Sequence, residues 1–163
     1  MKYLGVKLEN SLRWNENTSF ITGKASSRLG YILRPIPSLL PHLSDPAYKY
    51  LVRPVTEYCS TVWDGNLTAT QANSIEAIQR RAARLVNNIK RRDHVTSTTK
   101  LVEDLEWETL KARREMRRLG LFRAMHFDEV AVSIIDHLSR HPTNIGQSRK
   151  HQLQYFIPHC NTK

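Results

Sequence analysis

The sequence predicts a mainly α-helical protein with a short N-terminal β-strand or hairpin and an irregular basic tail. Three stretches carry apolar residues at intervals of three and four, which is the spacing of one buried helix face. Strand-like alternation occurs only near the start and, weakly, near the end of the chain. The 163 residues amount to about one domain, long enough to bury a hydrophobic core.

The first element is a strand. Leu4, Val6 and Leu8 alternate with other residues, and residues 9–11 supply a turn. A two-stranded ribbon is marginal in water, so a strand at the start of a helical chain suggests that its natural sheet lies elsewhere.

An apolar stripe spaced by four, four and three predicts a helix over residues 15–34, ended by three prolines. Lys24 and Arg28 share a face beside this stripe. Gly23 and Gly30 each cost on the order of 1 kcal/mol relative to alanine inside a helix. We therefore expect one or both to permit the close approach of another element.

A second helix is predicted over residues 45–63. Asp45 can cap free backbone N–H groups, and proline suits the first helical position after it. Pro54 lies inside the helix and is expected to kink it. The expected buried stripe is Ala47, Leu51, Val55, Tyr58 and Val62, widened by Tyr48, Val52, Cys59 and Trp63.

A third helix is predicted from a cap at Thr68 or Thr70 to about Asn88. It carries the densest charge run of the chain, with six positive and no acidic residues between Ala77 and Arg92. The whole chain has a net charge of +10, which favours a polyanionic partner such as nucleic acid. If all six neutralised phosphates, the logarithm of affinity would fall against that of salt with a slope of about −5. The six are Arg80, Arg81, Arg84, Lys90, Arg91 and Arg92.

The last helical region runs from Leu101, with a helix from Trp107 to about His126 and a short one over residues 128–138. Acidic and basic residues interleave over residues 106–118, so this surface is interpreted as a solvated face and not as a binding site.

Catalytic and metal-binding patterns are missing from the sequence. Two-metal chemistry needs convergent carboxylates, and the acidic residues here are scattered. Cys59 and Cys160 fit neither a disulfide framework nor a metal site. Pro142 directly follows His141, so we expect the helix that would align His137 with His141 to end there. We expect no metal or cofactor in this chain and no catalysis by it alone.

No membrane span or signal peptide is recognisable, which indicates an intracellular protein, nuclear or cytoplasmic and not secreted.

Short motifs follow one another in a definite order along nearly the whole chain. In this order and spacing they resemble the region after the catalytic palm in reverse transcriptases of non-LTR retrotransposons, the jockey-like LINE elements. The motifs are Lys2-Tyr3-Leu4-Gly5-Val6, Leu12-x-Trp14, Lys24-Ala25, Leu29-Gly30, Leu51-Val52-Arg53-Pro54, Glu57-Tyr58, Thr61-Val62-Trp63-Asp64, Ile78-Gln79-Arg80-Arg81-Ala82-Ala83-Arg84, Leu105-x-Trp107-x-x-Leu110, Arg113-Arg114 and, in the tail, Ser148-Arg149 and Phe156-Ile157-Pro158.

The resemblance implies a palm-edge strand near the primer grip in residues 1–14, a helical thumb-like domain in residues 15–138 and a basic, His-rich tail in residues 139–163. In that family the thumb holds the template–primer duplex, so RNA or an RNA–DNA duplex is the expected partner. The catalytic aspartates and their Mg²⁺ belong to a palm that would precede Met1. The chain is thus expected to be a polymerase segment cut at both ends. Its structural motif residues would be Tyr3, Leu4, Gly5, Trp14, Gly30, Pro54, Trp63, Asp64 and Trp107.

The nucleic-acid contacts we expect are the six residues of the basic run, with Lys24 and Arg28 as secondary ones. An alternative is a structural module that docks on a separate palm-containing polypeptide through the apolar surface of residues 45–63, without a nucleic-acid role of its own. A third interpretation, an intact enzyme with an unrecognised site, is disfavoured by the scattered carboxylates. The oligomeric state stays open.

Overall fold

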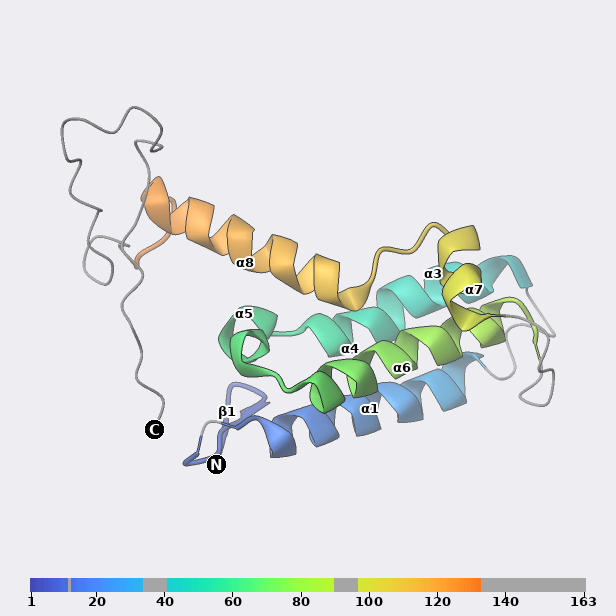
Figure 1. Ribbon diagram of the computed structural model, residues 1–163, viewed down its shortest axis with the longest axis horizontal. Helices are drawn as coiled ribbons and strands as arrows, with labels where there is room; N and C mark the ends of the chain where they lie inside the picture. The colour runs from blue at the N-terminus through green and yellow to red at the C-terminus, as the bar shows by residue number, and fades with distance from the viewer. Residues whose placement is uncertain (12, 34–40, 90–96, 133–163) are drawn as a thin grey trace. The chain divides into compact units, whose positions relative to one another are not determined.

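The computed structural model describes residues 1–11, 13–33, 41–89 and 97–132, and there the chain is mainly helical with one short strand pair, as predicted (Figure 1). It divides into two compact units, Met1–Arg118 and Leu119–Lys163. The elements are β1 (Lys2–Tyr3), β2 (Val6–Lys7), α1 (Asn15–Leu33), η1 (Pro41–Leu43), α3 (Ser44–Ala47), η2 (Tyr48–Val52), α4 (Arg53–Glu57), α5 (Ser60–Trp63), η3 (Asp64–Asn66), α6 (Ala69–Val86), α7 (Thr98–Asp104) and α8 (Leu110–His126).

The N-terminal strand finds its partner within the chain. β1 and β2 pair antiparallel, with Tyr3 opposite Val6, and Leu4 and Gly5 form the turn with φ of 42° and 87°. Positive φ at both positions is what a tight two-residue hairpin needs. The Tyr58 hydroxyl donates to the Leu4 carbonyl at 2.9 Å. The hairpin is thus held by its own chain, and the outside sheet expected for it stays a prediction.

The hairpin packs on one of two hydrophobic clusters in the first unit. The Lys7 amide donates to Asn17 Oδ1 at 3.1 Å, which ties β2 to the start of α1. This cluster consists of Val6, Trp14, Ile21, Trp63, Ile75 and Leu110.

The larger hydrophobic cluster contains residues of α1, α6 and α7, and also residues of the segment from α3 to α4. α1 and α6 run side by side, and α7 packs on the end of α6 (Figure 1). The Tyr48 ring stacks on the Trp107 ring with centroids 4.3 Å apart. The cluster consists of Ala25, Leu29, Ala47, Tyr48, Val52, Val55, Ile78, Ala82, Ala83, Leu101 and Trp107.

The second predicted helix is not one helix. A π-helical turn, η2, directly precedes the segment that holds Pro54, where the missing N–H was expected to disturb the helix. Cys59 then adopts a left-handed conformation with φ of 49°, which separates α4 from α5. These two irregularities rotate the apolar stripe. Leu51, Tyr58 and Val62, expected in the core, are 46%, 53% and 58% exposed.

The predicted helix cap at Asp45 is also wrong. Asp45 caps no helix, because α3 begins at Ser44 and its carboxylate instead accepts from Trp107 Nε1 at 2.9 Å and Lys49 Nζ at 2.8 Å. Of the two helix glycines, Gly23 permits no close approach, since a Cβ there would meet nothing within 4 Å, and the close approach at Gly30 stays a prediction.

The C-terminal helix starts later than predicted. Glu106 has φ of 53°, which ends the α7 region, and α8 begins at Leu110 instead of Trp107. Residues 128–132 are not helical, so the short helix predicted over 128–138 is wrong for that part. The remainder of that helix and the predicted tail, residues 139–163, lie outside the described residues. No helix in the described ranges is long and apolar enough to cross a membrane.

Candidate nucleic-acid interface

A capping box at Thr68, one of the two residues predicted to cap this helix, sets the start of α6. Gln71 N donates to Thr68 Oγ1 at 3.3 Å, and the Thr68 amide donates to Gln71 Oε1 at 2.8 Å. Gln71 Nε2 also donates to the Arg13 carbonyl and to Asn15 Oδ1, both at 2.8 Å. These bonds fix the first turn of α6 against the start of α1.

The apolar stripe of α6 then determines which side chains face outward. Ile75, Ile78 and Ala82 are buried, in agreement with the predicted stripe. Arg81 is exposed, whereas Arg80 and Arg84 are half-buried beside it. Three arginines of the predicted basic run therefore emerge on one side of the packed helix.

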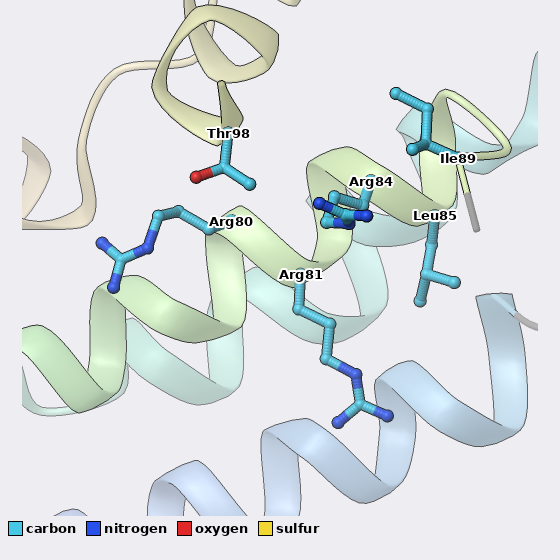
Figure 2. A pocket seen from close by; sticks show the side chains of 6 residues that line it. All are labelled: Arg80, Arg81, Arg84, Leu85, Ile89 and Thr98. Atoms are coloured by element: carbon cyan, nitrogen blue, oxygen red, sulfur yellow. The ribbon is translucent and has the colours of Figure 1, made fainter. Parts of the chain in front are cut away.

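These arginines line a hollow of about 590 Å³ between α6 and α7. Figure 2 shows the three side chains leaving adjacent turns of α6, with Thr98 of α7 across from Arg80. Leu85 of α6 and Ile89, which follows the end of that helix, form the apolar part of the wall. The lining residues are Arg80, Arg81, Arg84, Leu85, Ile89 and Thr98.

No acidic side chain is among the described residues of this lining. Arg80 Nη2 donates to the Asn73 carbonyl at 3.4 Å, which orients the guanidinium without neutralising it. Arg81 makes no hydrogen bond or ion pair within the described ranges. The described lining of the hollow therefore carries arginine side chains and no carboxylate, and guanidinium groups suit the oxygens of phosphates.

The other predicted contacts are not part of this hollow. Lys24 Nζ lies over the Phe20 ring, 5.9 Å from its centroid. Arg28 Nη1 donates to the Leu51 carbonyl at 3.1 Å. Neither lines the α6 hollow. Lys90, Arg91 and Arg92 lie outside the described residues.

The arginines of α8 form a different arrangement around two carboxylates whose ion pairs the sequence interpretation did not predict. The Glu57 side chain, 2% exposed, accepts from Arg113 and from Arg117 Nη2, the latter at 2.7 Å. Asp64 pairs with Arg114 Nε at 2.6 Å and Arg118 Nη1 at 3.2 Å. We call these four arginines and two carboxylates, Glu57, Asp64, Arg113, Arg114, Arg117 and Arg118, the α8 clasp.

The centre of the α8 clasp is buried, which gives the clasp a structural role. The Arg114 side chain is 1% exposed, and its guanidinium carbon lies 5.9 Å from the Trp63 ring centroid. The hydrogen bond to Glu57 raises the pKa of Arg113. Residues 106–118 were predicted to form a solvated face, but Arg114 and Arg117 pair with carboxylates that lie 50 and 60 positions earlier in the sequence. The sequence signal that was available is the predicted buried stripe of residues 45–63, which places Glu57 within that segment and Asp64 at its end.

The motif residues of the resemblance fall mainly into the framework. The three tryptophans are buried, and Asp64 belongs to the α8 clasp, whereas Gly30 is half-buried. The exposed ones are Tyr3, Leu4, Gly5 and Pro54, of which the first three belong to the hairpin.

No group of three or more His, Cys, Asp or Glu side chains in the described ranges is placed to hold a metal ion. Glu57 and Asp64 do not fit Mg²⁺, because their oxygens already accept from guanidinium groups.

No protein-family model, curated protein or solved structure matches the chain.

Proposed function

We propose that this chain is a thumb-like segment of an RNA-directed DNA polymerase that binds template–primer nucleic acid through its phosphate backbone. The observation that carries the binding proposal is the hollow lined by Arg80, Arg81 and Arg84, with no acidic side chain among its described lining residues. The polymerase assignment rests on the resemblance of the motifs to non-LTR retrotransposon reverse transcriptases.

The chemistry of the hollow favours backbone binding over base recognition. Guanidinium groups donate paired hydrogen bonds to phosphate oxygens, whose charge repeats along any nucleic acid. The hollow is open and lies on the side of a rigid helix, so it can follow a backbone without distinguishing bases. Binding of this kind releases counterions and weakens steeply with salt.

The test is equilibrium binding of an RNA–DNA duplex at 50 and 200 mM salt. Three phosphate contacts contribute a slope of about −0.9 × 3, so their part of the affinity falls about fortyfold over that change in salt. The variant Arg80→Glu/Arg81→Glu/Arg84→Glu is expected to lose this part. Undetectable binding by the unaltered protein at 50 mM would overturn the proposal.

A matched control separates the site from overall charge. Lys111 is exposed on α8, so Lys111→Glu changes the net charge as much as Arg81→Glu does. We expect the Arg81 variant to weaken duplex binding and the Lys111 variant to leave it nearly unchanged. Equal losses would mean that total charge and not the hollow governs binding.

Catalysis is expected to need a palm that this segment does not supply. A primer-extension assay with Mg²⁺ or Mn²⁺ checks this, and nucleotide incorporation by the chain alone would contradict it.

A second candidate, a module that docks on another polypeptide, is favoured by one observation. Leu51, Tyr58 and Val62 are 46%, 53% and 58% exposed although they belong to an apolar segment. Exposed apolar surface of this kind binds hydrophobic dyes and promotes association. A monomer that binds no such dye and unfolds in a clean two-state transition would count against this candidate.

A further inference from the structure

A second basic cluster surrounds Phe20 in α1. The Nζ atoms of Lys2, Lys7 and Lys24 lie 5.4, 5.1 and 5.9 Å from the centroid of its ring. The first two lysines come from the hairpin, where they face each other as a strand pair, and the third comes from the next turn of α1. The hairpin therefore gathers three ammonium groups around one aromatic ring.

The charges of this cluster are not compensated in the described part of the chain. None of the three lysines has an ion-pair partner there. Like charges gathered around one ring repel each other, and a bound anion relieves that repulsion. Contacts between exposed ammonium groups and an aromatic ring are weak, so the lysines can leave the ring for an anion.

The ring itself is held in place beside an open hollow. Phe20 is half-buried and packs against the cluster that contains Trp14 and Ile21. The adjoining hollow, of about 460 Å³, is lined by polar side chains as well as the ring. Its lining residues are Lys7, Asn15, Glu16, Ser19 and Phe20.

Glu16 determines which end of a bound ligand can enter the hollow. Its carboxylate is the one acidic group among the described lining residues, and it disfavours an anion inside the hollow. Asn15, Glu16 and Ser19 can instead form hydrogen bonds with the polar edge of a planar base. Lys2 and Lys24 do not line the hollow, so the anionic end of such a ligand belongs on the lysine side.

We propose that the Phe20 cluster binds a nucleotide of a single-stranded nucleic acid, with its phosphates on Lys2, Lys7 and Lys24 and its base stacked on Phe20. Stacking on an aromatic ring requires a base that is not already stacked in a duplex, which selects a single strand. The site has the same class of partner as the proposed function but uses none of the α6 arginines.

The first experiment measures binding of a labelled oligothymidine of about 12 nucleotides by fluorescence anisotropy at 50 and 200 mM salt. For Lys2→Gln/Lys24→Gln we expect the salt slope to shrink by about 0.7 × 2 and the affinity at 50 mM to fall on the order of tenfold. The control Lys49→Gln/Lys111→Gln removes the same charge elsewhere. Equal affinities of the lysine variant and the unaltered protein would overturn the proposal.

The second experiment tests the ring. Phe20→Leu is expected to weaken oligothymidine binding by about five- to hundredfold and to leave binding of an abasic oligonucleotide of the same length unchanged. Phe20→Trp keeps a stacking surface and should retain or strengthen binding, which separates loss of stacking from misfolding. An equal effect of Phe20→Leu on both oligonucleotides would refute base stacking.

The same variants distinguish this proposal from the previous one. Lys2→Gln/Lys24→Gln should bind an RNA–DNA duplex nearly as well as the unaltered protein, whereas Arg81→Glu should bind oligothymidine nearly as well. If duplex binding fails but oligothymidine binding depends on the lysines, the α6 proposal is wrong and this one stands.

Discussion

The arginines of α6 and those of α8 have the same i, i+1, i+4 spacing, yet their environments are opposite. On α8, Arg113 and Arg114 bond to the buried carboxylates of Glu57 and Asp64. On α6, Arg80 and Arg81 line a hollow without an acidic side chain among its described residues. A run of arginines therefore indicates a binding surface only after its counter-charges have been located.

The two sets also do different work for the fold. Taking charges out of water is costly, so a buried ion pair adds little net stability, but losing one partner leaves a buried charge uncompensated. Substitutions in the α8 clasp should therefore lower the free energy of unfolding. Substitutions of the α6 arginines should instead lower the affinity for nucleic acid.

The sharpest test of this contrast is Asp64→Asn. The change leaves Arg114, which is 0% exposed, without its charge partner. We expect the free energy of unfolding to fall by about 3–5 kcal/mol, measured by chemical denaturation. The exposed residue Glu103 provides the control Glu103→Gln, which should change it by less than about 0.5 kcal/mol. Similar small effects of both changes would show that the clasp is not needed for folding.

Alkaline pH tests the buried surroundings of the clasp. Burial raises the pKa of Tyr48 above its ordinary value of 10.0, with Glu57 adding to the effect and Arg53 opposing it. The folded state keeps the phenol proton after the unfolded chain has lost it, so this contribution is complete below about pH 10 and is lost as the pH rises further. The expected slope is about 1.4 kcal/mol per pH unit.

Tyr48→Phe isolates that dependence. The Tyr48 hydroxyl is buried and makes no hydrogen bond within the described residues, so its removal should cost little stability near neutral pH. Above pH 10 the variant should lose stability less steeply than the unaltered protein, as measured by denaturation at pH 9 to 11. Parallel curves would assign the alkaline sensitivity to other groups.

Arg117→Gln should have an intermediate effect. The Arg117 side chain is 48% exposed, and Glu57 keeps Arg113 as a second partner after the change. We expect a loss of about 1 kcal/mol in the free energy of unfolding, because solvent screens the pair. A loss as large as that of Asp64→Asn would mean that the clasp responds as one cooperative unit and not by burial.

Arg81→Gln should have the smallest effect on stability. Arg81 is exposed and has no partner within the described ranges, so unfolding should change by less than about 0.5 kcal/mol. Its salt slope for duplex binding should shrink by about 1. A marked loss of stability would place Arg81 in the framework and remove the contrast between the two helices.

The α6 part of this picture could be predicted from sequence because its causes are local. Thr68 and Gln71 lie three positions apart, and their capping box needs no distant partner. The stripe of Ile75, Ile78 and Ala82 follows directly from helical spacing. Once the apolar face of α6 is identified, helical periodicity alone places Arg81 on the outer face.

The segment from Asp45 to Val62 was harder to predict, because its apolar residues keep a regular helical spacing across two interruptions of the helix. The π turn and the left-handed Cys59 each rotate the following residues about the helix axis, so side chains with core spacing become exposed. Pro54 signalled a disturbance, but the sense of the rotation depends on packing against Trp107 and the hairpin.

By itself, the sequence determined the mainly helical class, the α6 cap and the position of the densest basic run, since propensity, capping and periodicity act over a few residues. Only the tertiary structure decided which charges are neutralised. The carboxylates that pair with Arg113 and Arg114 lie 56 and 50 positions away in the chain, and the lysines around Phe20 meet through a hairpin. Charge acts through distance in space, and distance along the sequence does not report it.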